Sequence, residues 1–336
     1  MKVAVVGAGA VGELHARSLA EAVDVLVISD ENLERAHHLA RQLGGVVAKD
    51  AFDALDSVDA AVIATPPESH AELVRAAVDR SCPVLCEKPL ATSVAEAIQL
   101  AEYVARRGVL VEVGFQRRFD AEYAAVQRAI REGKIGRLQL LRLHSAEPGR
   151  EPSPRTNLFR NTAIHDFDLV RWLSGDEVVS IYVEGSRRST TGFDHLLDPD
   201  TIVATMSLAR GALAVATVTR LSRSGYDVRA EVLGGRDYVS IGWSDRTPVR
   251  SLESGSPRST SAPWDSWRSR FAPAFREELS AFLAAVDGGS PRGASIDDAV
   301  AAQRIAEAAR CSMEERVPVS LDPGRAADLM FDARPS

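Results

Sequence analysis

Residues 1–20 read MKVAVVGAGAVGELHARSLA, and this stretch decides the fold. An apolar segment, residues 2–6, runs into the glycine turn Gly7-Ala8-Gly9-Ala10-Val11-Gly12 and then into a helix-forming segment, residues 13–20. Strand, glycine turn and helix in this order are the context in which G-x-G-x-x-G binds a dinucleotide. There Gly7 permits the tight turn, Gly9 lets the backbone approach a pyrophosphate, and Gly12 lets the helix pack on the strand. The helix N-terminus then faces the phosphate charge.

A second apolar strand, residues 25–28, ends at Ser29-Asp30, and Asp30 follows Gly12 by 18 residues. An acidic residue at this point binds the ribose hydroxyls of a dinucleotide. The carboxylate also repels a 2′-phosphate, so the sequence predicts NAD as the cofactor, preferred over NADP. One alternative stays open, in which Asp30 is the N-cap of a helix predicted over residues 33–43.

Length and composition narrow the class of protein. A chain of 336 residues predicts two domains, and 45% apolar with 26% charged residues is typical of a soluble globular protein. The net charge of −7 argues against a nucleic-acid partner, which would require a basic face. No apolar run is long enough to span a bilayer, and no basic-then-apolar leader precedes the first strand, so we expect a cytoplasmic protein.

The cysteines and histidines show no metal-ligand spacing. Cys82, Cys86 and Cys311 are an odd set without paired spacing, so packing explains them better than disulfides or a metal. His15 and the pair His37-His38 lie within predicted helices without repeated carboxylate or cysteine partners. We therefore expect no metal site, and we interpret these histidines as structural.

Strands and helices alternate through about residue 118 and predict a doubly wound parallel α/β sheet, here assigned to a first domain of residues 1–120. Later apolar runs follow one another with short polar turns, which predicts an open, mostly antiparallel sheet in an α+β domain of residues 121–336. One helix, predicted over residues 162–173, interrupts these strands. Two late amphipathic helices, near residues 274–285 and 297–312, could pack back on the first domain.

Several motifs in order carry a resemblance to a known family. The chain resembles the glucose–fructose oxidoreductase and inositol dehydrogenase family (GFO/IDH/MocA) over nearly its whole length. Within that family it looks most like inositol 2-dehydrogenases. The resemblance implies an outer sheet face that joins subunits into homodimers or homotetramers. Beyond the glycine turn, the motifs are residues 65–70 (TPPESH), 87–89 (EKP), 114–120 (GFQRRFD), 164–173 (IHDFDLVRWL) and 225–228 (GYDV).

Lys88 lies at the carboxyl end of a predicted parallel strand, where open α/β sheets place their ligands. A lysine in a partly dry pocket near another charge can share protons. The resemblance makes Lys88 an alcohol-orienting proton-relay residue and Glu87 a contact to the nicotinamide ribose. It also suggests that Thr65, Pro66 and His70 line the cofactor, as do Ala10 and Val11 within the glycine turn. For His70 a solvent-facing helix residue is an equally open alternative.

His165 is the candidate general base, because imidazole titrates near neutrality. In the resembling enzymes an aspartate commonly stands four residues earlier, and here that position is Asn161. An amide can hold the substrate or the imidazole but cannot stabilise an imidazolium by charge. Asp166 or Asp168 could compensate, although either could equally be a solvated helix acid.

At the remaining pocket positions, this chain keeps some of the residues of the resembling inositol dehydrogenases and replaces others. The resemblance makes Arg117 and Tyr226 substrate contacts, beside Lys88, Asn161 and His165. Ser224 stands where the resembling inositol dehydrogenases carry tyrosine, and His144 could answer to a pocket histidine just past the strand of residues 138–143. Arg118 is as well explained by a surface ion pair. Because a polyol pocket consists of directional hydrogen bonds, these departures bear on which sugar is accepted.

The function that these expectations favour is NAD-dependent oxidation of a secondary hydroxyl of a cyclitol or sugar to a ketone, with myo-inositol as the leading substrate. The runner-up is a dehydrogenase of an aminocyclitol, pyranose or nucleotide-sugar intermediate, since Arg150 and Arg155 could bind an anionic group. A different class is a non-catalytic NAD sensor that binds a protein partner. Such a sensor could lose Lys88 and His165 without harm, whereas both are present.

Overall fold

A computed structural model describes residues 1–149, 157–188, 198–249 and 261–321. The chain divides into two compact units. The first comprises Met1–Phe119 and Ala272–Gln303, and the second comprises Asp120–Phe271 and the chain from Arg304 onward. The late segment 272–303 therefore belongs to the first unit. The sequence predicts loops at residues 147–155 and 251–261. Most of both segments, including Arg150 and Arg155, is outside the described residues.

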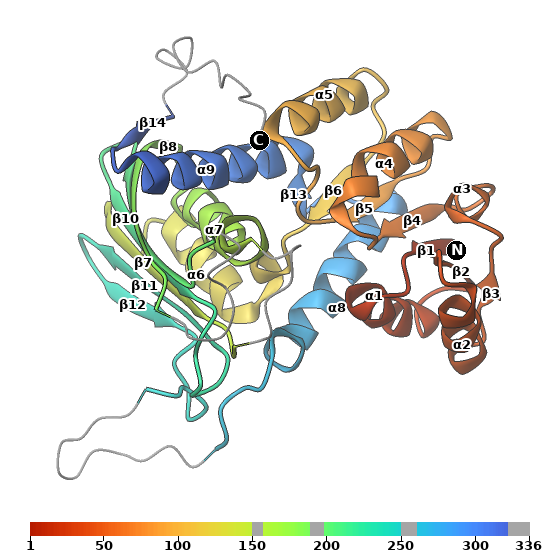
Figure 1. The fold of residues 1–336 in the computed structure, drawn as a ribbon, viewed down its shortest axis with the longest axis horizontal. Helices are drawn as coiled ribbons and strands as arrows, with labels where there is room; N and C mark the ends of the chain where they lie inside the picture. Colours follow the sequence, from red (N-terminus) through yellow and green to blue (C-terminus); the bar gives the residue numbers. More distant parts are fainter. Residues whose placement is uncertain (150–156, 189–197, 250–260, 322–336) are drawn as a thin grey trace. The chain divides into compact units, whose positions relative to one another are not determined.

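The sheet of the first unit is the predicted doubly wound parallel sheet, drawn in Figure 1 in red to yellow except for the blue edge strand β13. Its order is β13-β6-β5-β4-β1-β2-β3, so the strand order reverses between β1 and β4, where such sheets bind their ligands. All pairs are parallel except that of β13, an unpredicted edge strand. The strands are β1 (Lys2–Val6), β2 (Val25–Ser29), β3 (Val46–Val47), β4 (Ala60–Ile63), β5 (Val84–Glu87), β6 (Val111–Gly114) and β13 (Ala294–Ser295).

Helices cover both faces of this sheet. On one face, apolar residues of α1, α2 and α8 form a single buried cluster with side chains of β1, β2 and β4. Figure 1 shows α4 and α5 on the opposite face. The burial of apolar residues at helical spacing therefore fixes each helix against the strands. The helices are α1 (Ala10–Ala20), α2 (Leu33–Leu43), α3 (Ala51–Ala54), α4 (His70–Asp79), α5 (Val94–Ala105) and α8 (Trp267–Val286).

The second unit contains the expected open, mostly antiparallel sheet, in the order β12-β11-β7-β10-β9-β8-β14. The β10–β7 pair is parallel, and the other pairs are antiparallel. The strands are β7 (Leu138–Ala146), β8 (Val178–Ser186), β9 (Thr201–Leu208), β10 (Leu213–Thr219), β11 (Asp227–Gly234), β12 (Tyr238–Ile241) and β14 (Val319–Ser320).

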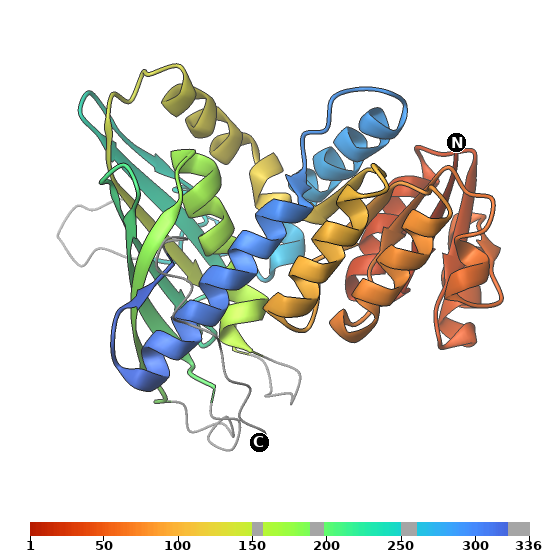
Figure 2. The same cartoon turned by 90° about the horizontal axis from the view of Figure 1, so that it is seen from above.

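One face of this second sheet carries the core of the unit. Alternate residues of β9, from Ile202 to Leu208, are buried together with residues of α6 (Ala121–Arg131), α7 (Ile164–Ser174) and the later part of α9 (Ile296–Glu315). The two views agree that the helices lie on one side of the sheet (Figures 1 and 2). Among the described residues no helix covers the other face, which we call the open face.

Two helix starts differ from the sequence-based expectation. The helix expected over residues 162–173 begins earlier, as the π-helical turn η3 (Phe159–Ala163) followed by α7. The helix expected from residue 274 begins at Trp267, so Pro273 lies inside it. Proline favours a helix start when only local preference is considered. Phe271, which precedes it in α8, is fully buried, and tertiary packing therefore extends the helix past the proline.

Candidate active site

The glycine turn between β1 and α1 has the shape that a pyrophosphate requires. Gly7 has φ +99°, and a Cβ there would lie 2.6 Å from the Ala64 carbonyl oxygen. A Cβ at Gly12 would lie 1.8 Å from the Gly7 carbonyl oxygen. At Gly9, the N-cap of α1, a Cβ would meet nothing within 4 Å. Ala10 and Val11 open the helix, where backbone N–H groups lack intrahelical partners, so this open space fits the phosphates of NAD.

Asp30 follows β2 and is connected to the glycine turn. Its Oδ2 accepts a hydrogen bond from Ala8 N at 2.7 Å, and its Oδ1 accepts one from Asn32 N at 2.8 Å. The N-cap of α2 is Asn32, whose side chain accepts from Arg35 N, so the alternative of Asp30 as that N-cap is wrong. The Asp30 carboxylate thus stands beside the turn, as a ribose-binding acid requires.

Glu87, Lys88 and Pro89 form the turn after β5, and the Lys88–Pro89 peptide bond is cis. The Glu87 carboxylate is buried and accepts from Lys88 N at 3.3 Å. His15 Nε2, on α1, lies 3.0 Å from Glu87 Oε1. Gly114 leaves room for this carboxylate, because a Cβ there would lie 3.0 Å from it. The Lys88 side chain is half-buried at the carboxyl end of the sheet.

Thr65 and Pro66 form the turn after β4, and the short helix η1 (Pro67–Ser69) leads from it into α4. Ser69 Oγ donates to Thr65 Oγ1 at 2.7 Å. His70 is buried at 1% exposure, so its solvent-facing alternative is wrong. Its ring nitrogens lie 2.8 Å from the carbonyl oxygens of Thr65 and Pro89. A direct cofactor contact of His70 stays a prediction, while this geometry favours an indirect role through these two turns.

Arg117 and Arg118 lie in the short helix η2 (Gln116–Phe119), which follows β6. Arg117 is buried at 2% exposure, at the same edge of the sheet as Lys88. Arg118 Nη1 pairs with Asp298 Oδ2 at 3.1 Å. The ion pair expected for Arg118 therefore exists, but its guanidinium is buried and not on the surface, because Asp298 comes from the late segment that joins the first unit.

The second unit carries Asn161 in η3 and His165 in the first turn of α7. His165 is buried, and so are Asp166 and Asp168, which contradicts their reading as solvated helix acids. Asp166 Oδ1 accepts a hydrogen bond from Ser145 Oγ of β7 at 2.9 Å. This bond ties the helix to the sheet beside His165. Packing of α7 on the strands thus buries acids that the helical pattern alone would leave in water.

Tyr226 immediately precedes β11 and is buried. Its backbone N donates to the Trp264 carbonyl oxygen at 2.7 Å, and its ring meets Phe271 edge-on at 6.3 Å between centroids. Gly225 before it has φ +121°, a conformation that a side chain would strain. These contacts hold the tyrosine in one place.

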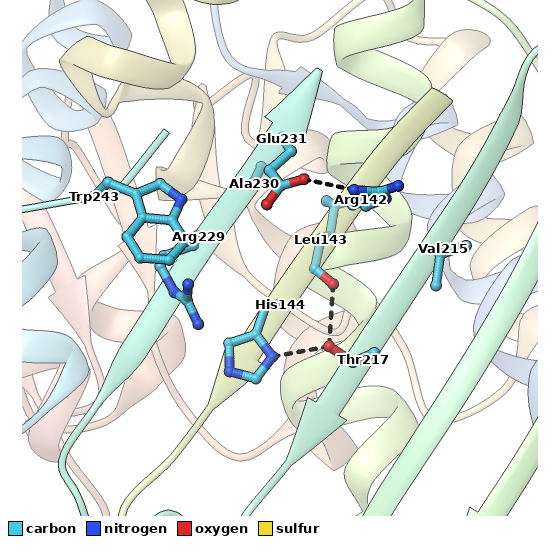
Figure 3. A pocket seen from close by; sticks show the side chains of 9 residues that line it. All are labelled: Arg142, Leu143, His144, Val215, Thr217, Arg229, Ala230, Glu231 and Trp243. Carbon is cyan, nitrogen blue, oxygen red and sulfur yellow. Dashed lines mark hydrogen bonds and ion pairs between the residues drawn. The ribbon is translucent and has the colours of Figure 1, made fainter. Parts of the chain in front are cut away.

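His144 lies among the residues that line a pocket of the second sheet (Figure 3). It faces away from α7, because its neighbours on β7 face the helices: Leu143 is part of the core, and Ser145 Oγ donates to Asp166. His144 Nδ1 lies 2.8 Å from Thr217 Oγ1, and its Nε2 lies 3.6 Å from Asp227. Burial lowers the pKa of His144, and Asp227 opposes that shift. The suggested pocket role of His144 is therefore wrong, since strand alternation directs it to the open face. There it lines a cavity of about 280 Å³ with Arg142, Leu143, Val215, Thr217, Arg229, Ala230, Glu231 and Trp243.

The predicted cofactor-site residues of the first unit gather at one edge of one sheet. The glycine turn follows β1, Asp30 follows β2, Thr65 follows β4, and Lys88 follows β5, and these strands are neighbours in parallel register. Arg117 follows the next strand, β6. Because parallel strands end at the same edge, five segments distant in sequence meet there. Asn161, His165 and Tyr226 come from the second unit.

Comparisons with known proteins agree with this geometry. A family model described as an oxidoreductase family with an NAD-binding Rossmann fold matches residues 1–115, and a GFO/IDH/MocA C-terminal domain model matches residues 123–239. This chain belongs to the GFO/IDH/MocA oxidoreductase family. Both the resemblance and the two-sheet fold expected from the sequence are thereby confirmed.

Individual members of the GFO/IDH/MocA family match over nearly the whole chain. Myo-inositol dehydrogenase Hyg17 of Streptomyces leeuwenhoekii is 36% identical over 95% of this chain and 100% of its own length. Inositol 2-dehydrogenase 1 of Saccharopolyspora erythraea is 34% identical over 96% of both chains. The crystal structure of myo-inositol dehydrogenase from Lactobacillus casei, in complex with NAD(H) and myo-inositol, superposes with a TM-score of 0.83 at 25% identity, over 96% of this chain and 97% of that one.

The contacts of two residues of the first unit, His15 and Gln303, could not be predicted from the sequence. His15, interpreted as structural, contacts Glu87, and its only signal is its position three residues after Gly12. Gln303 binds the backbone of Ala91 through both its amide atoms, at 3.0 and 3.3 Å, across 212 residues of sequence. Neither pairing has a local signature, because each joins segments that only the fold brings together.

The described residues offer neither a metal-binding cluster nor a membrane-spanning helix. In those residues, no group of three or more His, Cys, Asp or Glu side chains could hold a metal ion. None of the helices described there is both long enough and apolar enough to cross a bilayer. Cys82, Cys86 and Cys311 are free thiols, and burial raises the pKa of Cys82 to about 11. That thiol is therefore protonated and unreactive at neutral pH.

Proposed function

We propose that this chain is an NAD-dependent dehydrogenase that oxidises a secondary hydroxyl of a cyclitol, with myo-inositol as the leading substrate. The observation that carries the proposal is the gathering of the glycine turn, Asp30 and Lys88 at the carboxyl ends of neighbouring parallel strands. Relatives named for inositol oxidation cover nearly the whole chain, which supports the substrate class.

Each residue has a part in the proposed reaction. When bound, NAD supplies the hydride acceptor. Residues 7–12 hold the pyrophosphate, and Asp30 accepts hydrogen bonds from the adenosine ribose. Glu87 contacts the nicotinamide ribose, beside a cofactor wall formed by Thr65 and Pro66. Lys88 orients the reacting hydroxyl and relays its proton.

The second unit supplies the proposed base. His165 accepts the hydroxyl proton as the hydride leaves carbon, and it returns that proton in the reverse reaction. Asn161 and Tyr226, with Arg117 of the first unit, hold the remaining hydroxyls by directional hydrogen bonds. A pocket that loses or gains a hydrogen-bond partner changes its preference between similar polyols. Asn161 and Ser224 differ from the residues of the resembling enzymes, so we expect these two positions to set the preferred sugar.

Cofactor preference, compartment and assembly complete the proposal. We infer that NAD is preferred over NADP, because the Asp30 carboxylate would repel a 2′-phosphate. Free cysteines suit a reducing compartment such as the cytoplasm. The open face of the second unit supports a homodimer or homotetramer. The alternative of an anionic substrate rests on Arg150 and Arg155, which lie outside the described residues.

The proposal is tested by mixing the purified chain with NAD or NADP and a panel of polyols headed by myo-inositol, and by following reduced-cofactor absorbance. NADH formation with myo-inositol is the expected result. NADH formation only with another cyclitol or sugar would keep the mechanism and replace the substrate. Absence of turnover with every neutral polyol, together with tight NAD binding, would overturn the proposed substrate class.

A Lys88→Ala variant distinguishes an enzyme from an NAD sensor. We expect turnover to fall by about 10²–10⁴-fold, the usual contribution of a positioned proton-transfer group, while NAD binding persists. Arg131→Ala, on an exposed part of α6, is the control and should keep full turnover. Equal turnover of the Lys88→Ala variant and the wild type would contradict the role of Lys88.

A further inference from the structure

Two buried histidines contact the Glu87–Lys88–Pro89 turn from different elements. His15 on α1 reaches the Glu87 carboxylate, and His70 at the start of α4 reaches the Pro89 carbonyl oxygen. Each is 1% exposed. Lys88 therefore lies between two residues whose positions are set by histidines from two other segments of the sheet edge.

His15 connects this turn to the glycine turn. Its ring is on the helix that Gly9 caps, and its Nε2 lies 3.0 Å from Glu87 Oε1 across 72 residues of sequence. Because a carboxylate accepts and does not donate, Nε2 carries the proton of this hydrogen bond. Phe275 of α8 packs edge-on against the ring at 5.7 Å between centroids. A Cβ at Gly114 would lie 3.0 Å from the same carboxylate, so a glycine at this position leaves the space that the carboxylate occupies.

His70 connects the same turn to the Thr65 turn. Its Nδ1 lies 2.8 Å from Pro89 O and its Nε2 lies 2.8 Å from Thr65 O. Both partners are carbonyl oxygens and can only accept. A neutral imidazole has one N–H and one lone pair, whereas the imidazolium has two N–H groups. Two short bonds to two carbonyls thus require a ring that is protonated on both nitrogens.

We propose that His15 and His70 are positioning residues that hold the Glu87–Lys88–Pro89 turn to the glycine turn and the Thr65 turn, and that His70 does so as an imidazolium. The inference rests on the proposed function for its effect on turnover, but not for its effects on NAD affinity and histidine protonation. Catalytic groups held by such supporting hydrogen bonds lose efficiency when they move by about 1 Å.

The first experiment compares His15→Phe with His15→Gln. Phenylalanine keeps the ring against Phe275 but cannot donate, whereas the glutamine amide can donate to Glu87. If His15 acts by its hydrogen bond, His15→Phe lowers NAD affinity about tenfold or more, and His15→Gln recovers part of the loss. If the ring serves only to pack, the phenylalanine variant binds NAD normally and the glutamine variant is the worse of the two, which would overturn the assignment.

A double-mutant cycle locates the effect at Glu87. We expect His15→Phe to cost little NAD affinity once Glu87→Gln is present, because both changes remove the same hydrogen bond. Additive losses would show that His15 acts elsewhere. Glu112→Gln is the control: Glu112 is buried in β6 and accepts from the backbone of Arg292 and Gly293. That substitution can change the melting temperature but should leave NAD affinity unchanged.

The protonation of His70 is read from nitrogen NMR of a ¹⁵N-histidine-labelled chain at neutral pH. His70→Gln removes one signal and so assigns it. We expect both ring nitrogens of His70 to appear protonated. One protonated and one bare nitrogen would overturn the imidazolium. We also expect His70→Gln to lower kcat more than it raises the KM for NAD, because Lys88 is displaced; unchanged kcat would overturn the positioning role.

Failure of this inference and failure of the proposed function have different signatures. A wild-type chain that binds NAD but oxidises no polyol rejects the proposed substrate, and the affinity and NMR measurements still decide the roles of both histidines. Wild-type turnover together with unaffected histidine variants rejects the positioning roles alone. A wild-type chain that binds no NAD rejects the proposed function and the effect of His15 on NAD affinity, and the NMR measurement still decides the protonation of His70.

Discussion

Asp30 combines two roles in one carboxylate, since it accepts from the backbone of Ala8 and is the candidate ribose acceptor. Asp30→Asn keeps an acceptor oxygen and removes the charge. We expect the preference for NAD over NADP, as the ratio of kcat/KM values, to fall about tenfold, because neutral hydrogen bonds are weaker than charge-assisted ones and the repulsion of a 2′-phosphate is lost. Glu34→Gln, on exposed α2, should leave the ratio unchanged. An unaltered ratio in Asp30→Asn would contradict the assignment.

Asn161 lies four residues before His165 and provides a second test at this scale. Asn161→Asp introduces a negative charge, which favours the protonated imidazole. We expect the acid limb of the pH profile of kcat/KM to move to higher pH by about one unit, so that activity is lost sooner as the pH falls. Asn157→Asp, the same change one helical turn further away, should move the limb much less. An unchanged pH profile would show that the side chain at position 161 does not influence the proposed base, His165.

At the scale of the element, the strand–turn–helix of residues 2–20 contains two glycines with different functions. Gly12 packs against the turn, and Gly9 faces open space. We expect Gly12→Ala to lower the unfolding free energy by about 3 kcal/mol, because its Cβ overlaps the Gly7 carbonyl. Gly9→Ala should keep wild-type stability but lower NAD affinity about tenfold or more, because the methyl group fills the phosphate space.

Thermal melts and NAD titrations of the two glycine variants distinguish these roles. The pair serves as its own control, because the chemical change is identical and the positions are three residues apart. Normal NAD binding by Gly9→Ala would show that the phosphates do not approach the backbone at that residue.

At the scale of the whole molecule, the open face of the second unit is the surface best suited to join copies of the chain. Val203 of β9 is 44% exposed and Leu213 of β10 is 54% exposed there. Apolar side chains gathered on an exposed sheet face indicate an interface. We expect the wild type to be a dimer or tetramer by light scattering, and Val203→Arg with Leu213→Arg to reduce it to a monomer.

Leu33→Arg is the control for this test, because Leu33 is an exposed apolar residue of the first unit. It should leave the molecular mass of the assembly unchanged. A monomeric wild type would contradict the proposed assembly. If the two arginine substitutions leave the mass unchanged, the subunit interface does not lie on the open face.

Local patterns in the sequence were enough to predict the doubly wound first sheet, the open second sheet and the residues that meet at the carboxyl edge of the first sheet. The glycine turn, Asp30 and Lys88 each sit at the end of an apolar strand, and strand ends of a parallel sheet must meet. These features depend on neighbours in sequence, so spacing and residue type suffice to predict them.

Only the tertiary structure decided the features that join distant segments. It assigned residues 272–303 to the first unit, buried Asp166 and Asp168, and turned His144 to the open face. It also revealed the bond of His15 to Glu87 and the bridge made by His70. A helical pattern shows which residues share a face but not what that face meets, and a strand pattern cannot show which face will be covered. Those choices are made by packing between elements, which has no signature in the local sequence.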